Sequence, residues 1–334
     1  MRSFVPSPFL AALAALLVLG LGLLVTPVLV AAQAGKVARV GVLSSTLPRS
    51  AVFYRALEER LRELGYEEGT TLVVHFRSAG GNADRLPGLA AELIRAGVDV
   101  VVAGGPEATL RAARQASATV PIVMVAIDYD PIARGYVASL ARPGGRVTGV
   151  FIRQLELTRK RLELFKEALP ALRRVAVLWD TFSADQLREA EAAALAIGLQ
   201  PQPLERGPGP YDFDRAFAAA RANGAEALLI LASPVFFRDR ARLLEAAATH
   251  RLPTMAAQHE WVDSGGLLSY GANYVDMWRR GADYVDMILK GGRPSDLPVA
   301  QPDRFELVLN RKTAAALGVA LPPALVLRAD RVVE

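Results

Sequence analysis

Short apolar runs alternate with segments of helical period along this chain from Lys36 onward, and this alternation constrains the fold more than any other feature of the sequence. Strands that alternate with helices are typical of parallel sheets built from βαβ units. The runs are apolar at successive positions, which indicates strands covered by helices on both faces. We therefore predict an α/β protein with doubly wound parallel sheets.

The first half of the chain reads as one series of such units. The predicted strands are Val37–Leu43, Thr71–Phe76, Val98–Ala103 and Pro121–Ile127. The predicted helices are Ala51–Leu64, Asp84–Ala96 and Glu107–Ala116. The turn residues Pro143-Gly144-Gly145 then interrupt the pattern, which indicates the end of the series.

A second series of the same kind follows the turn residues. Its predicted strands are Val175–Trp179, Gln200–Leu204, Ala227–Leu231 and Pro253–Ala256. Its predicted helices are Glu156–Ala168, Asp185–Ile197, Phe213–Ala222 and Val235–Thr249. We expect the last elements to cross back between the two halves, and these are a strand Leu267–Tyr270, a helix Tyr274–Leu289, a strand Phe305–Leu309 and a helix Thr313–Leu317.

About 300 residues remain after a predicted leader, which is enough for two lobes with separate cores. We predict that residues 36–150 and 272–300 form the first lobe, and that residues 151–271 and 301–334 form the second. Ligands bind beyond the carboxyl ends of the strands in such sheets. A hinge between two lobes of this kind makes a cleft that can close on a ligand.

Residues 1–34 are predicted to be a secretory signal peptide. Arg2 precedes an apolar run from Phe9 to Ala32 that ends in small residues suited to cleavage. Cleavage after Ala32 and after Ala34 both fit, and we favour the second. The run is long enough to span a bilayer if it stays uncut, so an uncleaved anchor is the alternative. Either way we expect a periplasmic or extracytoplasmic protein.

Composition excludes several classes of function. The chain has no cysteine, which excludes a lipid-modified N-terminus, a disulfide framework and thiolate chemistry. Its net charge is +5 with Lys and Arg spread along the chain, which argues neither for nor against nucleic acid, and our predicted partners include no nucleic acid. The histidines His75, His250 and His259 lack the spacing of metal ligands, and we predict neither a metal nor a cofactor. Without a nucleophile elbow or a phosphate-binding loop, we predict no catalytic residues.

The loops that follow the predicted strands of the first lobe carry candidate ligand contacts. Ser44 and Ser45 offer hydroxyl groups beside a helix start, where they either hold an anionic group such as a carboxylate or only cap the helix. Gly104 and Gly105 let the backbone approach a ligand closely, although a tight turn needs the same residues. Glu107 adds a negative charge, which favours an ammonium group nearby.

Further candidate contacts follow later strands, and they are Asp128, Tyr129, Asp180, Thr181, Ser233 and Tyr270. Asp128 or Asp180 is suited to pair with a cation of the ligand, and Tyr129 offers a ring for stacking. An aspartate that precedes a helix is more often a cap, so this role stays open beside the ligand contact.

The chain resembles the bacterial ABC-transporter substrate-binding proteins related to the tryptophan and tyrosine receptors, with a periplasmic-binding-protein type I fold. The segments that carry the resemblance are Val40-Gly41-Val42-Leu43, Ala83-Asp84-Arg85-Leu86-Pro87, Val102-Ala103-Gly104-Gly105, Pro121-Ile122-Val123-Met124-Val125, Ser139-Leu140-Ala141-Arg142-Pro143-Gly144-Gly145, Ser269-Tyr270-Gly271, Leu289-Lys290-Gly291-Gly292, Phe305-Glu306-Leu307-Val308 and Ala316-Leu317-Gly318. It implies a hinged receptor, monomeric and without enzymatic activity, that delivers an amino-acid-like or aromatic-acid ligand to a membrane permease with a cytoplasmic ATPase.

Two departures from the family pattern lie in the expected cleft. Family members often carry Thr-Pro after the Gly-Gly pair and Asn-Pro after the strand of the second lobe, whereas this chain has Pro106-Glu107 and Asp180-Thr181. Both departures bear on which ligand the protein binds.

Two other functions fit the same fold and leader, a ligand-sensing partner of a membrane receptor and an exported α/β hydrolase. We do not expect a DNA-binding regulator, although such regulators also use this two-lobed fold. A regulator needs a helix-turn-helix headpiece at the N-terminus, where this chain has the predicted leader.

Overall fold

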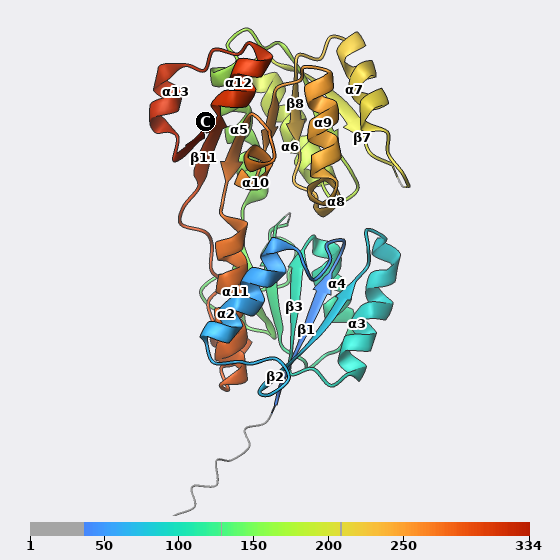
Figure 1. Cartoon of the computed structure of the whole chain (residues 1–334). Helices are drawn as coiled ribbons and strands as arrows, with labels where there is room; N and C mark the ends of the chain where they lie inside the picture. The colour runs from blue at the N-terminus through green and yellow to red at the C-terminus, as the bar shows by residue number, and fades with distance from the viewer. Residues whose placement is uncertain (1–36, 128, 208) are drawn as a thin grey trace, which may run out of the picture. The chain divides into compact units, whose positions relative to one another are not determined.

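The computed structural model describes residues 37–334 apart from Asp128 and Pro208, and the predicted signal peptide lies outside the described residues. The described chain folds around two β-sheets, each with helices on both faces (Figure 1). We call the part around the sheet that contains β1 the first lobe and the part around the other sheet the second lobe. The predicted fold class is confirmed.

The first sheet has five strands in the order β2-β1-β3-β4-β5, and every neighbouring pair is parallel. The strands are Ala38–Ser44 (β1), Leu72–Ser78 (β2), Val100–Gly105 (β3), Ile122–Ala126 (β4) and Val147–Phe151 (β5). The helices of this lobe are Val52–Glu63 (α2), Leu86–Arg95 (α3) and Glu107–Ala116 (α4), with a 3-10 turn at Ala83–Arg85 (η1).

Side chains of the first sheet alternate between two apolar clusters, as strand geometry requires. Val100 and Val102 of β3 belong to the cluster that contains residues of α2 and of a later helix, α11 (Tyr274–Leu289). Val101 and Ala103 belong to the cluster on the opposite face, with residues of α3 and α4. This double burial explains why the strands read as continuous apolar runs in the sequence.

The second sheet has seven strands in the order β12-β11-β10-β9-β8-β6-β7, and its pairs are parallel except for β10 with β11. Its strands are Arg174–Trp179 (β6), Gln200–Glu205 (β7), Ala227–Ile230 (β8), Thr254–Ala256 (β9), Leu268–Gly271 (β10), Glu306–Asn310 (β11) and Arg331–Val333 (β12). Its helices are Gln154–Ala168 (α5), Ala184–Ala196 (α6), Phe213–Ala222 (α7), Pro234–Arg238 (α8), Arg240–Thr249 (α9), His259–Asp263 (α10), Arg311–Leu317 (α12) and Pro323–Arg328 (α13).

The chain passes between the two sheets three times. It leaves the first sheet after β5, returns between β10 and α11, and leaves again through the segment between Ala300 and β11. Helix α11 follows a strand of the second sheet but contacts α2, β4 and β5 of the first lobe. A further 3-10 turn, Pro294–Asp296 (η2), follows α11, and Ala300 then forms an isolated bridge with Val150. Helix α11 is therefore connected through the chain to the second sheet and packs against the first.

Most predicted elements are found within a few residues of their expected bounds, and the helices α4, α7 and α11 match them fully. The single helix predicted at Val235–Thr249 is wrong, because the structure has the two helices α8 and α9 with Asp239 between them. The Arg240 guanidinium lies 4.5 Å from the centre of the Phe237 ring and donates to the Phe237 carbonyl, which stabilises the break. The sequence patterns also missed β5, α10, α13 and β12.

Across the described ranges, no helix combines the length and the apolar character needed to cross a bilayer.

Candidate ligand-binding site

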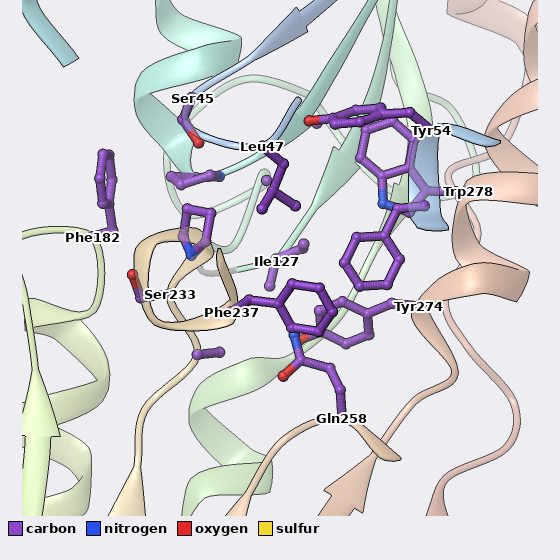
Figure 2. A pocket seen from close by; sticks show the side chains of 16 residues that line it. Ser45, Leu47, Tyr54, Ile127, Phe182, Ser233, Phe237, Gln258, Tyr274 and Trp278 are labelled. Atoms are coloured by element: carbon purple, nitrogen blue, oxygen red, sulfur yellow. The ribbon is translucent and has the colours of Figure 1, made fainter. Parts of the chain in front are cut away.

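A pocket lies where loops at the carboxyl ends of strands from both sheets meet, and we call it the interlobe pocket (Figure 2). Ser45, Gly104 and Ile127 come from the ends of strands β1, β3 and β4, and Ser233 and Gln258 from the loops after β8 and β9. The full lining is Ser45, Leu47, Phe53, Tyr54, Gly104, Gly105, Pro106, Ile127, Phe182, Ala232, Ser233, Pro234, Phe237, Gln258, Tyr274 and Trp278. The pocket therefore occupies the position that the topology predicts for a ligand.

Five aromatic side chains form one side of the pocket, and we call them the aromatic wall: Phe53, Tyr54, Phe237, Tyr274 and Trp278. The Tyr54 and Trp278 rings meet edge to face, with centres 4.7 Å apart. Phe53 lies 4.9 Å from Phe237 and 5.9 Å from Tyr274, again between ring centres. These separations are typical of favourable aromatic pairs, so the wall is a continuous apolar surface contributed by both lobes.

Helix α11 supplies two members of the wall through its first turns. The Asn273 side chain caps the helix by accepting a hydrogen bond from the Asp276 backbone N–H at 3.3 Å. Tyr274 and Trp278 are four residues apart, which places them on the same helix face. Both are buried. The cap thus fixes the start of the helix that presents these two rings.

Gly104 receives the Trp278 ring. A Cβ atom at residue 104 would lie 2.0 Å from Trp278 Cη2 and 2.3 Å from Cζ2, well inside van der Waals contact. Only glycine leaves room for this approach, so Gly104 shapes the pocket by admitting an indole ring of the protein itself.

The polar side chains of the lining are Ser45, Ser233 and Gln258. The Ser233 hydroxyl donates to Asp180 Oδ2 at 2.5 Å and accepts from the Val235 backbone N–H at 3.1 Å. Gln258 Oε1 accepts from the indole Nε1–H of Trp261 at 3.0 Å. Two of the three polar groups are therefore oriented by neighbours outside the lining.

Asp180 lies behind Ser233 and is buried. Its Oδ1 accepts from the Phe182 backbone N–H at 3.0 Å and lies 3.2 Å from the Ser183 hydroxyl. Burial raises the pKa of this carboxyl group, and the hydrogen bonds from Ser233, Ser183 and Phe182 oppose the shift. The carboxylate is thus engaged within the protein, where it positions Ser233 and Phe182 at the pocket.

Ser44 supports the pocket from behind. Its hydroxyl donates to the Leu47 carbonyl at 2.8 Å and hydrogen-bonds the hydroxyl of Tyr54. Burial raises the pKa of Tyr54, and the hydrogen bond with Ser44 partly opposes that shift. Ser44 therefore holds two lining residues, while the neighbouring Ser45 lines the pocket itself.

Glu107 and Thr181 line a separate pocket beside the first, and the two pockets share Pro106 and Phe182. The Tyr136 hydroxyl donates to Glu107 Oε1 at 2.5 Å, and Arg134 Nε lies 3.5 Å from Glu107 Oε2. Burial and the contact with Glu107 raise the pKa of Tyr136 to about 12. The ring of Tyr129 packs edge to face on Tyr136 at 5.8 Å and is not among the lining residues of the interlobe pocket.

The remaining predicted contacts lie elsewhere. Tyr270 packs against Phe305, with ring centres 6.3 Å apart, and its carbonyl accepts from Nε of the buried Arg161 at 2.7 Å. Asp128 lies outside the described residues. The structure thus brings four predicted residues into the lining, namely Ser45, Gly104, Gly105 and Ser233, with Ser44 and Asp180 directly behind them.

The aromatic wall is the part of the site that sequence reasoning missed. Its members lie on α2, α8 and α11 at positions that also satisfy the apolar period of a core-facing helix, so they read as ordinary core. The pairing of Tyr274 with Trp278 one helical turn later was the available signal. Within the described part of the chain, no group of three or more His, Asp or Glu residues is arranged to hold a metal ion.

Comparisons with known proteins agree with this geometry. A solved structure of a conserved domain protein from Vibrio cholerae matches with a TM-score of 0.80 and 26% identity, over 89% of this chain and all of that one. The structure of an ABC domain in complex with L-Trp from Streptococcus pneumonia matches with a TM-score of 0.78 and 24% identity, over 89% of this chain and 99% of that one, which is a likeness of fold. A tyrosine-binding protein of Clostridioides difficile is 24% identical over 267 residues, 79% of this chain and 75% of the relative.

Two parallel-sheet lobes with a pocket at their facing strand ends define a binding protein of the periplasmic type I fold. The family model for ABC transporter substrate-binding proteins matches residues 48–333. The chain belongs to this family.

Proposed function

We propose that this protein is the extracytoplasmic receptor of an ABC importer and binds a small amino-acid-like or aromatic-acid ligand in the interlobe pocket. The observation that carries the proposal is the aromatic wall, because five rings from both lobes converge on one pocket. Aromatic surfaces gain most of their binding free energy from burying another flat apolar group. The tyrosine-binding relative and the L-Trp complex of similar fold support an aromatic ligand.

The polar side of the pocket is suited to the carboxylate of such a ligand. The Ser45 hydroxyl and the backbone at Gly104 and Gly105 lie at the carboxyl ends of β1 and β3, next to the start of α4. Backbone N–H groups at a helix start favour a negative charge. In this proposal the carboxylate lies on that side of the pocket, and the apolar part of the ligand lies against the wall.

Delivery follows from contact with both lobes. A ligand that touches residues of both lobes stabilises the arrangement in which the lobes enclose it, by the difference in its affinity for the two states. The enclosed form then presents one surface to a permease that works with a cytoplasmic ATPase. Removal of residues 1–34 would release the receptor outside the cytoplasm.

The test is calorimetric titration of the mature protein after unfolding and refolding have removed any bound ligand. We expect L-tryptophan, L-tyrosine or L-phenylalanine to bind at least about tenfold more tightly than L-leucine or L-glutamate, because only the first three present a ring to the wall. Phe237→Ala should weaken binding, whereas Phe305→Ala, which removes an exposed ring outside the pocket, should not.

Refolded protein that binds none of these compounds, and shows no thermal stabilisation by aromatic acids, would rule the proposal out. Equal affinity for leucine and the aromatic amino acids would contradict the role given to the wall.

A further inference from the structure

One polar atom of the aromatic wall has no hydrogen-bond partner. The indole Nε1–H of Trp278 is buried, and no acceptor lies within reach of it among the described residues. Only 2% of the Trp278 surface is exposed, so bulk water does not satisfy it. Buried donors in native proteins are nearly always paired, which makes an unpaired one inside a binding pocket informative.

The position of the ring is built into the fold. The benzo edge of the Trp278 indole occupies the space above Gly104, and Tyr54 packs against the ring from one side. Figure 2 shows the indole nitrogen on the edge turned away from Tyr54 and toward the side on which Phe237 and Tyr274 lie. Because the opposite edge is held by backbone, the ring cannot easily rotate to find another acceptor.

The other tryptophan close to the pocket, Trp261, has a partner inside the protein. Trp261 is also buried, and its Nε1–H donates to Gln258 Oε1 at 3.0 Å. Most of the lining is apolar or aromatic, and the side chains of Leu47, Phe53 and Ile127 carry no acceptor. A molecule that occupies the pocket can therefore supply the missing acceptor.

Building on the proposed function, we propose that Trp278 determines specificity by donating its Nε1–H to an acceptor atom on the ring of the ligand. The ligand class is then narrower than aromatic amino acids or acids in general. It comprises those with a ring nitrogen or ring oxygen that accepts a hydrogen bond. A pocket with a built-in donor discriminates against a ligand that lacks the acceptor, because the donor stays unpaired in that complex.

The decisive probes are the 2-, 3- and 4-pyridyl isomers of alanine, compared with L-phenylalanine. Each isomer replaces one ring C–H by an accepting nitrogen and keeps the shape of the ring. We expect the wild-type protein to bind one isomer at least about tenfold more tightly than it binds phenylalanine. This difference is in the range for one buried hydrogen bond. Trp278→Phe should abolish that preference, measured against phenylalanine binding to the same variant.

Trp179→Phe is the matched control. Its indole Nε1 is also buried without a partner, but Trp179 does not line the interlobe pocket. This variant makes the same chemical change elsewhere and should keep the isomer preference. The preference is compared between variants, so the different hydration of pyridine and benzene rings cancels.

The hydrogen bond of Trp278 can also be observed directly in the wild-type protein by NMR, so this test does not require that a variant folds. The chain has three tryptophans, so a protein labelled with ¹⁵N-tryptophan gives three indole N–H signals. The signal that is missing from Trp278→Phe, or the one most shifted by ligand if that variant does not fold, should move downfield in ¹H with the preferred isomer and not with phenylalanine. The signal of Trp179, which does not line the pocket, should stay in place.

The outcomes separate the two proposals. Aromatic amino acids that bind without any isomer preference, and without a downfield indole shift, would overturn the role of Trp278 and leave the proposed function standing. Failure of every aromatic compound to bind would overturn the proposed function itself.

Discussion

The hydroxyl proton of Ser233 points to the buried carboxylate of Asp180, and this serine is one of the two polar side chains that the second lobe contributes to the lining, with Gln258. As long as Asp180 is ionised, Ser233 presents a lone pair to a ligand and not a proton. A protonated Asp180 reverses the hydrogen bond and frees the serine proton. The chemistry of Ser233 therefore depends on a residue that does not line the pocket.

Asp180→Asn tests this coupling through the pH dependence of stability. Burial raises the pKa of Asp180 above its ordinary value of 3.8, so the folded state holds this proton more tightly than the unfolded chain does. The wild-type protein must then lose stability relative to Asp180→Asn as pH rises from about 4 toward the raised pKa, and the difference must level off above it. Urea denaturation of both proteins at several pH values measures it.

Ser233→Ala is the companion variant. It removes a hydrogen bond that holds the Asp180 pKa down, so the pH-dependent loss should extend to higher pH. A difference between wild type and Asp180→Asn that does not change with pH would show that Asp180 is not perturbed in the folded protein.

At the scale of elements, helix α11 joins the hinge to the aromatic wall. It begins at Asn273, directly after the crossing from β10, and carries Tyr274 and Trp278 in its first turns. Its cap therefore stabilises both the helix and the two rings.

Asn273→Ala should lower the free energy of unfolding by about 1 kcal/mol, because the Asp276 backbone N–H loses its acceptor. Asn273→Ser keeps a capping oxygen and should lie within a few tenths of a kcal/mol of wild type. Urea unfolding curves of the three proteins measure the effect. Equal stability of the alanine and serine variants would mean that the cap contributes nothing.

The elements also show what the sequence can and cannot predict. Helix α11 was predicted with its full bounds because Asn273 caps a long amphipathic segment that ends before Gly291-Gly292. Strand β5 was missed because it has five residues and follows turn residues that suggested the end of the series. The loop residues Ser45, Gly104 and Ser233 were found from topology, since parallel strands direct their carboxyl ends to one edge. The wall was not found, because a ring that faces a ligand and a ring that faces the core share the same period.

At the scale of the whole molecule, polar contacts outside the lining of the interlobe pocket bridge the two lobes. Arg134 of the first lobe pairs with Asp185 at the start of α6, with Nη2 and Oδ2 2.7 Å apart. Arg238 of α8 donates to the Gly80 carbonyl at 3.4 Å. These contacts hold together the residues that line the pocket from either lobe.

Arg134→Ala should speed ligand dissociation by about 1.5- to 5-fold. Both side chains of its pair with Asp185 are partly exposed, at 45% and 31%, and such pairs contribute about 0.2–1 kcal/mol. Stopped-flow tryptophan fluorescence measures the rate, and added salt should shrink the effect. Arg188→Ala is the matched control, because Arg188 contacts the same carboxylate within α6 and bridges nothing. An equal effect of both variants would contradict a role for the bridge.

The rings that form the wall belong to the same apolar cluster as the strands and helices around them. Replacing one of them to admit a new ligand therefore also removes core packing, at a cost of about 3–5 kcal/mol for a large aromatic residue changed to alanine. The polar lining residues are outside this apolar cluster, although Gln258 also accepts the hydrogen bond of the buried Trp261 indole. Over evolutionary time, we expect ligand preference to drift through these polar positions first, while the rings persist as long as the fold does.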